Sequence, residues 1–137
     1  MLAFAISDAC NQLGTGQFIA NWSKDWLSPQ FLPAIVFLIS SFIAFSTGTS
    51  WGTFAIMLAI SIPMAEIHQS ELTLVIAATL GGGVFGDHCS PISDTSIISS
   101  MASASDHIDH VRTQLPYALV GGVITTIIYL ILGFVVY

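Results

Sequence analysis

The class of this protein is indicated by residues 26–65, WLSPQFLPAIVFLISSFIAFSTGTSWGTFAIMLAISIPMA, a stretch of 40 residues without a charged side chain. A second uncharged run of 25 residues covers positions 113–137. A helix that crosses a bilayer needs about 20 mostly apolar residues. Both runs exceed that length, so the sequence predicts an all-α membrane protein, a transmembrane helix bundle that contacts the lipid bilayer.

The composition excludes several other classes of protein. Of the 137 residues, 54% are hydrophobic and 7% are charged, whereas a soluble domain has roughly 25% charged residues. The net charge of −6, with only two basic residues, excludes a basic nucleic-acid binder. Two cysteines are too few for a disulfide framework. The apolar content also excludes a disordered chain and argues strongly against a soluble enzyme.

Residues 31–65 are too long for one straight membrane helix. At 1.5 Å per residue they would extend about 52 Å, against about 30 Å of hydrocarbon. The segment Thr47-Gly-Thr-Ser-Trp-Gly-Thr53 is poor helix material and is the expected break. The result is either one discontinuous span or a re-entrant hairpin with this segment at its tip. Such backbone is tolerated at membrane depth only where protein or a water-filled cavity surrounds it.

The rest of the chain divides into three further helical segments. They are a helix over residues 1–20, interrupted near Gly14, a broken helix over 72–105, interrupted from Gly81 to Asp94, and a final helix over 116–137. The chain is apolar from its first residue, so we expect it to be the later part of a longer protein. The two basic residues, Lys24 and Arg112, lie on one side of the membrane if residues 31–65 cross it once, and on opposite sides if these residues form a hairpin. The positive-inside rule favours the first arrangement.

The second break, Gly86-Asp-His-Cys-Ser-Pro-Ile-Ser-Asp-Thr95, contains the most informative polar residues. Within a helix, Pro91 would leave the Asp87 carbonyl without a hydrogen bond. Ionisable residues inside a membrane are functional candidates by default. The simpler alternatives are that Asp94 caps the following helix and that Asp87 lies at the water interface. The paired ligand spacing of zinc sites is absent.

The first break offers uncharged oxygen ligands. Thr47, Thr49 and Ser50 supply hydroxyls, and unwound backbone frees carbonyls. Such oxygens suit a hard cation such as sodium, although a kink that lets two helices pack closely explains the same composition. A third acid, Asp8, either faces the same cavity or is solvated near one end of the chain.

Three motifs together resemble the NhaC-type sodium/proton antiporters. They are TGTSWGTF at residues 47–54, GDHCSPISDT at 86–95 and DHIDHVRTQLPY at 106–117. The resemblance implies a secondary transporter built from two inverted repeats, of which this chain is the C-terminal one. It also implies that the two breaks meet near mid-membrane and contribute to an ion site. The site candidates carried over are Thr47, Thr49, Ser50, Asp87, Ser90, Ser93, Asp94 and Thr95.

The chemistry expected of this site is competition between sodium and a proton for one carboxylate, that of Asp87 or Asp94. Burial favours the protonated acid, whereas a bound cation favours the ionised form. We therefore expect sodium/proton antiport across the cell inner (plasma) membrane by a multi-pass carrier that needs no cofactor beyond the transported ions. The chain would require an N-terminal repeat or a partner chain, and homo-oligomerisation stays open.

Two alternatives remain at this stage. One is a sodium- or proton-coupled organic acid carrier of the same superfamily, which the absence of an intramembrane Lys or Arg disfavours. The other is a structural membrane subunit without transport. A membrane enzyme is not expected, because the sequence has no convincing nucleophile–base pair.

Overall fold

The computed structural model describes residues 2–136, and every regular element in this range is helical. This confirms the predicted all-α class. The elements are α1 (Leu2–Gln12), α2 (Thr15–Ser23), the 3₁₀ turn η1 (Pro29–Phe31), α3 (Leu32–Thr47), α4 (Ser50–His68), α5 (Leu72–Cys89), α6 (Asp94–Ala102) and α7 (His107–Val136).

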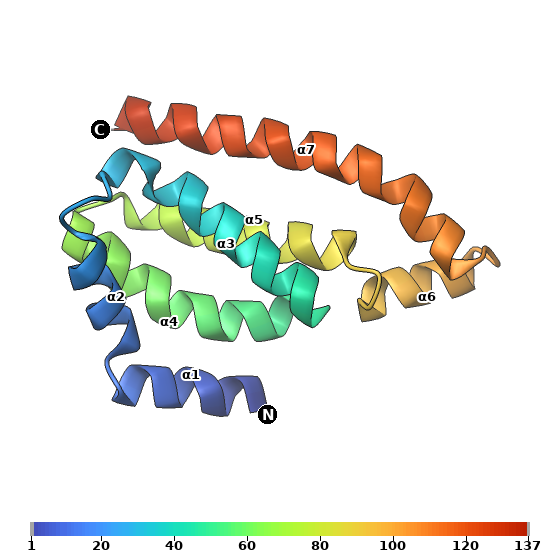
Figure 1. The fold of residues 1–137 in the computed structure, drawn as a ribbon, viewed down its shortest axis with the longest axis horizontal. Coiled ribbons are helices and arrows are strands. Elements are labelled where there is room, and N and C mark those ends of the chain that lie inside the picture. The colour runs from blue at the N-terminus through green and yellow to red at the C-terminus, as the bar shows by residue number, and fades with distance from the viewer. Residues whose placement is uncertain (1, 137) are drawn as a thin grey trace.

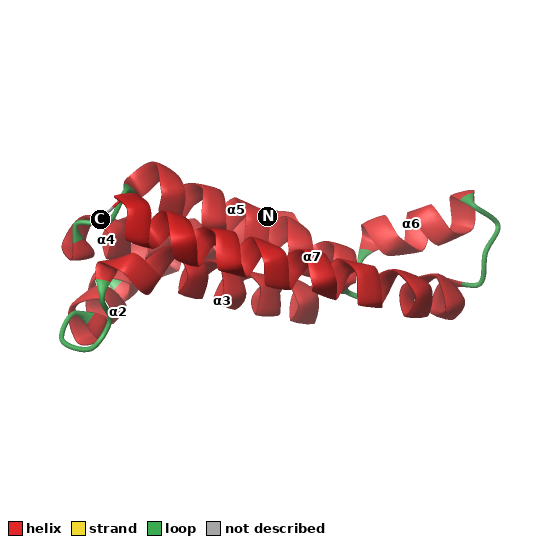
Figure 2. Ribbon diagram, turned by 90° about the horizontal axis from the view of Figure 1, so that it is seen from above, coloured by secondary structure: helices red, strands yellow, loops and turns green. Residues whose placement is uncertain are grey.

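Four helices are long and apolar enough to cross a membrane. They are Pro29–Thr47, which joins η1 to α3, and the helices α4, α5 and α7. In Figure 1, α3 and α5 form the centre, α4 packs on one side, α7 lies along the other side, and α1 covers the outer face of α4. Figure 2 shows α6 and the first turns of α7 extending beyond this bundle. The chain is a multi-pass membrane protein.

The distribution of side chains fits a lipid environment. Large apolar residues are exposed along α7, including Ile124, Ile131 and Val135, whereas the interior contains many small hydroxyl side chains. A soluble protein would bury the large apolar residues because water drives them inside. In lipid that drive is absent, and close packing and hydrogen bonds between helices hold the bundle together.

Residues 31–65 form a hairpin and not one discontinuous span. Helices α3 and α4 run in opposite directions, and only Gly48 and Thr49 separate them. Gly48 has φ of 66°, in the left-handed region, and its N–H donates to the Ala44 carbonyl at 2.8 Å. The predicted break over Thr47–Thr53 is therefore too wide, because Ser50–Thr53 already form the first turn of α4.

The second predicted break, over Gly81–Asp94, is also too wide. Helix α5 continues through its glycines to Cys89, so only Ser90–Ser93 leave the helix. The glycines serve close packing instead of unwinding. Gly82 and Gly86, one helical turn apart, face the Phe37 and Ser41 carbonyls of α3, where an added Cβ would collide with the backbone. This spacing of small residues is typical of close contacts between membrane helices.

The interruption predicted near Gly14 is present, since α1 and α2 are divided at this residue, whose φ is 66°. The start of the final helix differs from the prediction. The final helix begins at His107 and not at 116, with Pro116 inside it. The cause is Asp106, whose Oδ1 accepts the N–H groups of Ile108 at 2.9 Å and Asp109 at 3.2 Å. This N-cap lets the polar residues before Pro116 join the helix.

The two basic residues lie at opposite ends of the bundle. The C-terminal end of α2, which Lys24 follows directly, is at one end, and the first turns of α7, which contain Arg112, are at the other. This arrangement matches the hairpin alternative, in which the two residues lie on opposite sides of the membrane, and not the single crossing that the positive-inside rule favoured. The hairpin of α3 and α4 is the reason, since it returns the chain to the side from which it came.

The glycine contact between α3 and α5 generates a prediction about stability. We expect Gly86→Ala to destabilise the protein by about 1–3 kcal/mol, because its methyl group overpacks the interface with Ser41 and Ala44. The matched control is Gly121→Ala in α7, where no atom lies within 4 Å of the added carbon. Melting temperatures of the detergent-purified variants test this. Equal melting temperatures for the two variants would contradict it.

Candidate functional site

The two breaks in the helices adjoin each other. Helices α3 and α5 run parallel and end at the same level (Figure 1). The Ser90 hydroxyl donates to the Phe45 carbonyl at 2.7 Å, and Gly48 lies against the Ile92 carbonyl. The C-terminal ends of α3 and α5 therefore meet the N-terminal ends of α4 and α6. That the breaks meet agrees with the resemblance, whereas their depth in the bilayer stays a prediction.

Asp87 is the buried acid of this region. Its side chain is 3% exposed and lies in the last turn of α5. The Ser93 hydroxyl donates to Asp87 Oδ1 at 2.7 Å, and the Thr95 hydroxyl donates to Oδ2 at 3.1 Å. Helix α5 ends before Pro91, and the Ser90 N–H donates to the Asp87 backbone carbonyl at 3.1 Å. A tight turn replaces the lost helical bond.

The three side chains form a ring of short oxygen–oxygen contacts. The Ser93 and Thr95 hydroxyl oxygens are 2.7 Å apart, in addition to their contacts with Asp87. Each hydroxyl has one proton to donate. If both donate to an ionised Asp87, no proton remains between Ser93 and Thr95. If Oδ2 bore a proton, the direction of its contact with Thr95 would reverse, with Asp87 donating to Thr95, Thr95 to Ser93, and Ser93 to Oδ1.

Asp94 has a different environment from Asp87. Its side chain is exposed, and its Oδ1 accepts the Thr95 N–H at 2.8 Å. It is the first residue of α6, so Ser93 and not Asp94 is at the N-cap position. A carboxylate in the first turn of a helix is favoured by the helix dipole. The structure thus distinguishes the two candidate acids, and only Asp87 is enclosed by hydroxyl groups.

The candidates from the first break lie beside this ring without bonding to it. The Thr47 side chain is exposed and donates to the Ile43 carbonyl at 2.9 Å within its own helix. The Thr49 carbonyl accepts the Thr53 hydroxyl at 2.9 Å, and Ser50 begins α4. These residues form the hairpin tip that packs against the second break. Among the predicted site residues, the structure brings together the side-chain oxygens of Asp87, Ser93 and Thr95. Ser90 connects the two breaks through its hydrogen bond to Phe45.

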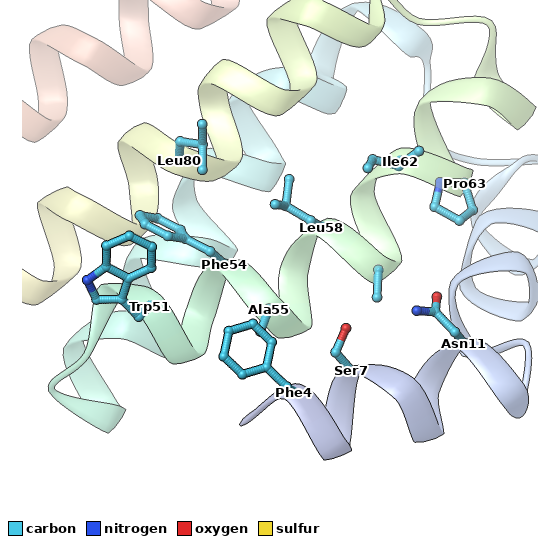
Figure 3. A pocket seen from close by; sticks show the side chains of 11 residues that line it. Phe4, Ser7, Asn11, Trp51, Phe54, Ala55, Leu58, Ile62, Pro63 and Leu80 are labelled. Carbon is cyan, nitrogen blue, oxygen red and sulfur yellow. The ribbon is translucent and has the colours of Figure 1, made fainter. Parts of the chain in front are cut away.

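Asp8 does not belong to the site. It is exposed, accepts a hydrogen bond from Gln12 Nε2 at 2.9 Å, and lies in α1 on the far side of α4. The cleft between α1 and α4 has a volume of about 620 Å³ and is mostly apolar. Figure 3 shows its lining side chains, among them Phe4, Trp51 and Leu58, with Ser7 and Asn11 as polar exceptions. No acid is among the described residues that line it, so it does not match the predicted ion site.

The sequence analysis did not identify a polar hollow that lies next to Asp87. This hollow, of about 160 Å³, lies between α5, α6 and α7 and is lined by His88, Thr95, Ser96, Ser99, His110 and Gln114. The signal that could have revealed it is the i, i+4 spacing of His110 and Gln114 on one helix face. Recognising it required a helix start before residue 110, which the Asp106 N-cap indicates.

The chain resembles known transport proteins over nearly its whole length. A family model described as "Na+/H+ antiporter family" matches residues 1–134. An uncharacterized protein of Haemophilus influenzae is 46% identical over 133 residues, which cover 96% of this chain and 26% of that protein. The malate-2H(+)/Na(+)-lactate antiporter of Bacillus subtilis is 34% identical over 113 residues, covering 82% of this chain and 24% of the relative.

A more distant relative is the Na(+)/H(+) antiporter NhaC of Alkalihalophilus pseudofirmus, 27% identical over 120 residues, 88% of this chain and 26% of that protein. The chain therefore spans about a quarter of the length of the curated relatives it matches. No solved structure gives a significant match.

The ring around Asp87 generates a prediction about stability. We expect Ser93→Ala to cost about 1–3 kcal/mol, because it leaves Asp87 Oδ1 buried without its hydroxyl donor. Ser103→Ala is the matched control, since Ser103 is exposed and bonds within its own turn. Thermal unfolding of the purified variants tests the difference. The prediction fails if Ser93→Ala melts at the temperature of Ser103→Ala.

Proposed function

The chain belongs to the Na+/H+ antiporter family, and from this premise we propose that it supplies the ion-binding part of a carrier that exchanges sodium for protons. The observation that supports this proposal is the buried carboxyl of Asp87, which is held by the hydroxyls of Ser93 and Thr95 at the junction of two helix breaks. The resemblance inferred from the three motifs is confirmed by the family match.

In the proton-loaded state, Asp87 is protonated and completes the ring with Ser93 and Thr95. The ring satisfies every polar group of the buried carboxyl without a net charge, which keeps the cost of burial low. All three groups donate and accept one hydrogen bond within the ring.

In the sodium-loaded state, the ion replaces the proton. Sodium is a hard cation that prefers oxygen ligands, and the ionised Asp87 with the Ser93 and Thr95 hydroxyls supplies them. The C-terminal ends of α3 and α5 add partial negative charge from carbonyls without helical partners. Proton and sodium exclude each other because both require the same carboxylate. Sodium binding therefore weakens as pH falls.

Alternating access requires a second structural unit. We propose that the N-terminal repeat of an inverted pair, on the same chain or a partner chain, closes the site from the other side. The location proposed for the assembled carrier is the cell inner (plasma) membrane, and oligomerisation of the whole carrier is compatible with the exposed apolar face of α7. The transported ions are substrates, and the proposal invokes no cofactor.

The principal alternative is a carrier that couples sodium or protons to an organic acid. The printed name of the Bacillus subtilis relative, a malate-2H(+)/Na(+)-lactate antiporter, favours this class. The site offers little to an organic anion, however. Within residues 2–136, Lys24 and Arg112 are the only Lys or Arg residues, and both are exposed. A buried carboxyl among hydroxyls attracts a cation and repels a second carboxylate.

The proposed function predicts opposite results for the two acids. We expect Asp87→Asn in the full-length gene product to abolish sodium-driven proton movement, because the amide cannot exchange a proton for a cation. Asp94→Asn, the matched control at an exposed position, is expected to retain most of the activity. Everted membrane vesicles with a fluorescent pH indicator measure the response to added sodium. Exchange that survives Asp87→Asn, or that is lost only in Asp94→Asn, would refute the assignment.

A second prediction distinguishes the inorganic exchanger from the organic acid carrier. Proteoliposomes containing the full-length gene product are expected to move protons in response to a sodium gradient when no organic acid is present. Addition of malate or lactate on either side should leave the rate unchanged. A strict requirement for one of these acids would instead assign the protein to the alternative class.

A further inference from the structure

The polar hollow beside Asp87 has polar side chains that do not belong to the ring of Asp87, Ser93 and Thr95. Its lining includes the two imidazoles of His88 and His110, the amide of Gln114 and three hydroxyl side chains. A volume of about 160 Å³ has room for several water molecules. Its side chains offer hydrogen-bond partners to water, whereas cavities that remain empty in proteins are lined by apolar groups.

One side chain in the hollow lacks a hydrogen bond that water can supply. The Gln114 Oε1 atom is shielded from solvent and has no partner among the residues that the structure describes. A buried carbonyl oxygen without a donor costs free energy. A small rotation of the amide toward the hollow pairs this oxygen with a water molecule or a hydrated cation. Gln114 therefore indicates an occupant that donates hydrogen bonds or bears positive charge.

The hollow shares a wall with the ion site. Thr95 lines the hollow, and its hydroxyl oxygen is 3.1 Å from Asp87 Oδ2. One hydroxyl group thus separates the water in the hollow from the buried carboxyl. Ser93, the second hydroxyl partner of Asp87, is fully buried.

The polar hollow lies toward one end of the bundle. The first turns of α7, which line the hollow with His110 and Gln114, extend beyond α3 and α5 together with α6 (Figure 2). In the opposite direction along α7 the next hollow is apolar and is lined by residues such as Phe37, Phe85 and Leu119. Water and ions cannot follow that apolar route without losing their hydration.

We infer that the hollow bounded by His88, Thr95, Ser96, Ser99, His110 and Gln114 is a hydrated vestibule. Through it, sodium and protons reach Asp87 from the side of the membrane on which α6 and the first turns of α7 lie. Gln114 is a positioning residue, which orients water or the hydrated cation before it passes Thr95. This inference rests on the proposed function, because it assigns the route by which the exchanged ions reach the same site.

Cysteine labelling tests the vestibule directly. In the full-length gene product, freed of its native cysteines, we place Gln114→Cys in the hollow and Thr126→Cys in the neighbouring apolar hollow of the same helix. The probe is a small, membrane-impermeant, positively charged methanethiosulfonate added to right-side-out or inverted vesicles. We expect Gln114→Cys to react from one side only, about tenfold or more faster than Thr126→Cys, because only a hydrated thiol ionises to the reactive thiolate.

Ser99→Cys provides an independent reporter on the α6 wall of the same hollow. It is expected to react from the same side as Gln114→Cys, so the test does not depend on one variant folding. Labelling is read on the protein itself and needs no transport. Modification is also expected to lower sodium-driven proton movement about tenfold, since a bulky cation then fills the path between water and Thr95.

The outcomes separate the two proposals. If neither thiol reacts faster than Thr126→Cys, or if complete labelling leaves exchange unchanged, the vestibule is refuted even when Asp87→Asn is inactive. If labelling is rapid and one-sided but Asp87→Asn retains exchange, the hollow is hydrated and the ion-site assignment fails. Rapid one-sided labelling, loss of exchange on labelling and an inactive Asp87→Asn together support both.

Discussion

The close parallel contact between α3 and α5 is the interaction on which the site depends. Gly82 and Gly86 let the α5 backbone approach the carbonyls of Phe37 and Ser41, so the two helices end at the same level. Only then can the Ser90 hydroxyl reach the Phe45 carbonyl and join the two breaks. In lipid, packing of this kind replaces the hydrophobic effect as the force between helices.

The cost of burying a carboxyl explains the composition around it. An acid in an apolar region must be neutral, paired or hydrogen-bonded. Asp87 is bonded to Ser93 and Thr95, which are in turn 2.7 Å apart. Hydroxyl groups suit this task because they donate to an acid yet also accept from it and coordinate a cation. The same three side chains can therefore satisfy both the protonated and the cation-bound site.

The sequence predicted the chemical identity of the site better than its geometry. It identified Asp87, Ser93 and Thr95 as candidates, and the structure places their oxygens in one ring. It could not separate Asp87 from Asp94, which follows seven residues later in the same motif. The direction of α6 after the turn at Pro91 decides this, since it turns Thr95 toward Asp87 and leaves Asp94 exposed.

The sequence by itself determined the membrane class and the approximate positions of the two breaks, because the absence of charge and the length of apolar runs are local properties. The tertiary structure alone decided how wide the breaks are and which acid is enclosed. The glycines of α5 resemble a loop in sequence, yet they are helical because a neighbouring helix needs the space that a side chain would occupy. This requirement comes from a helix that is distant in the sequence, so the local sequence of α5 does not predict it.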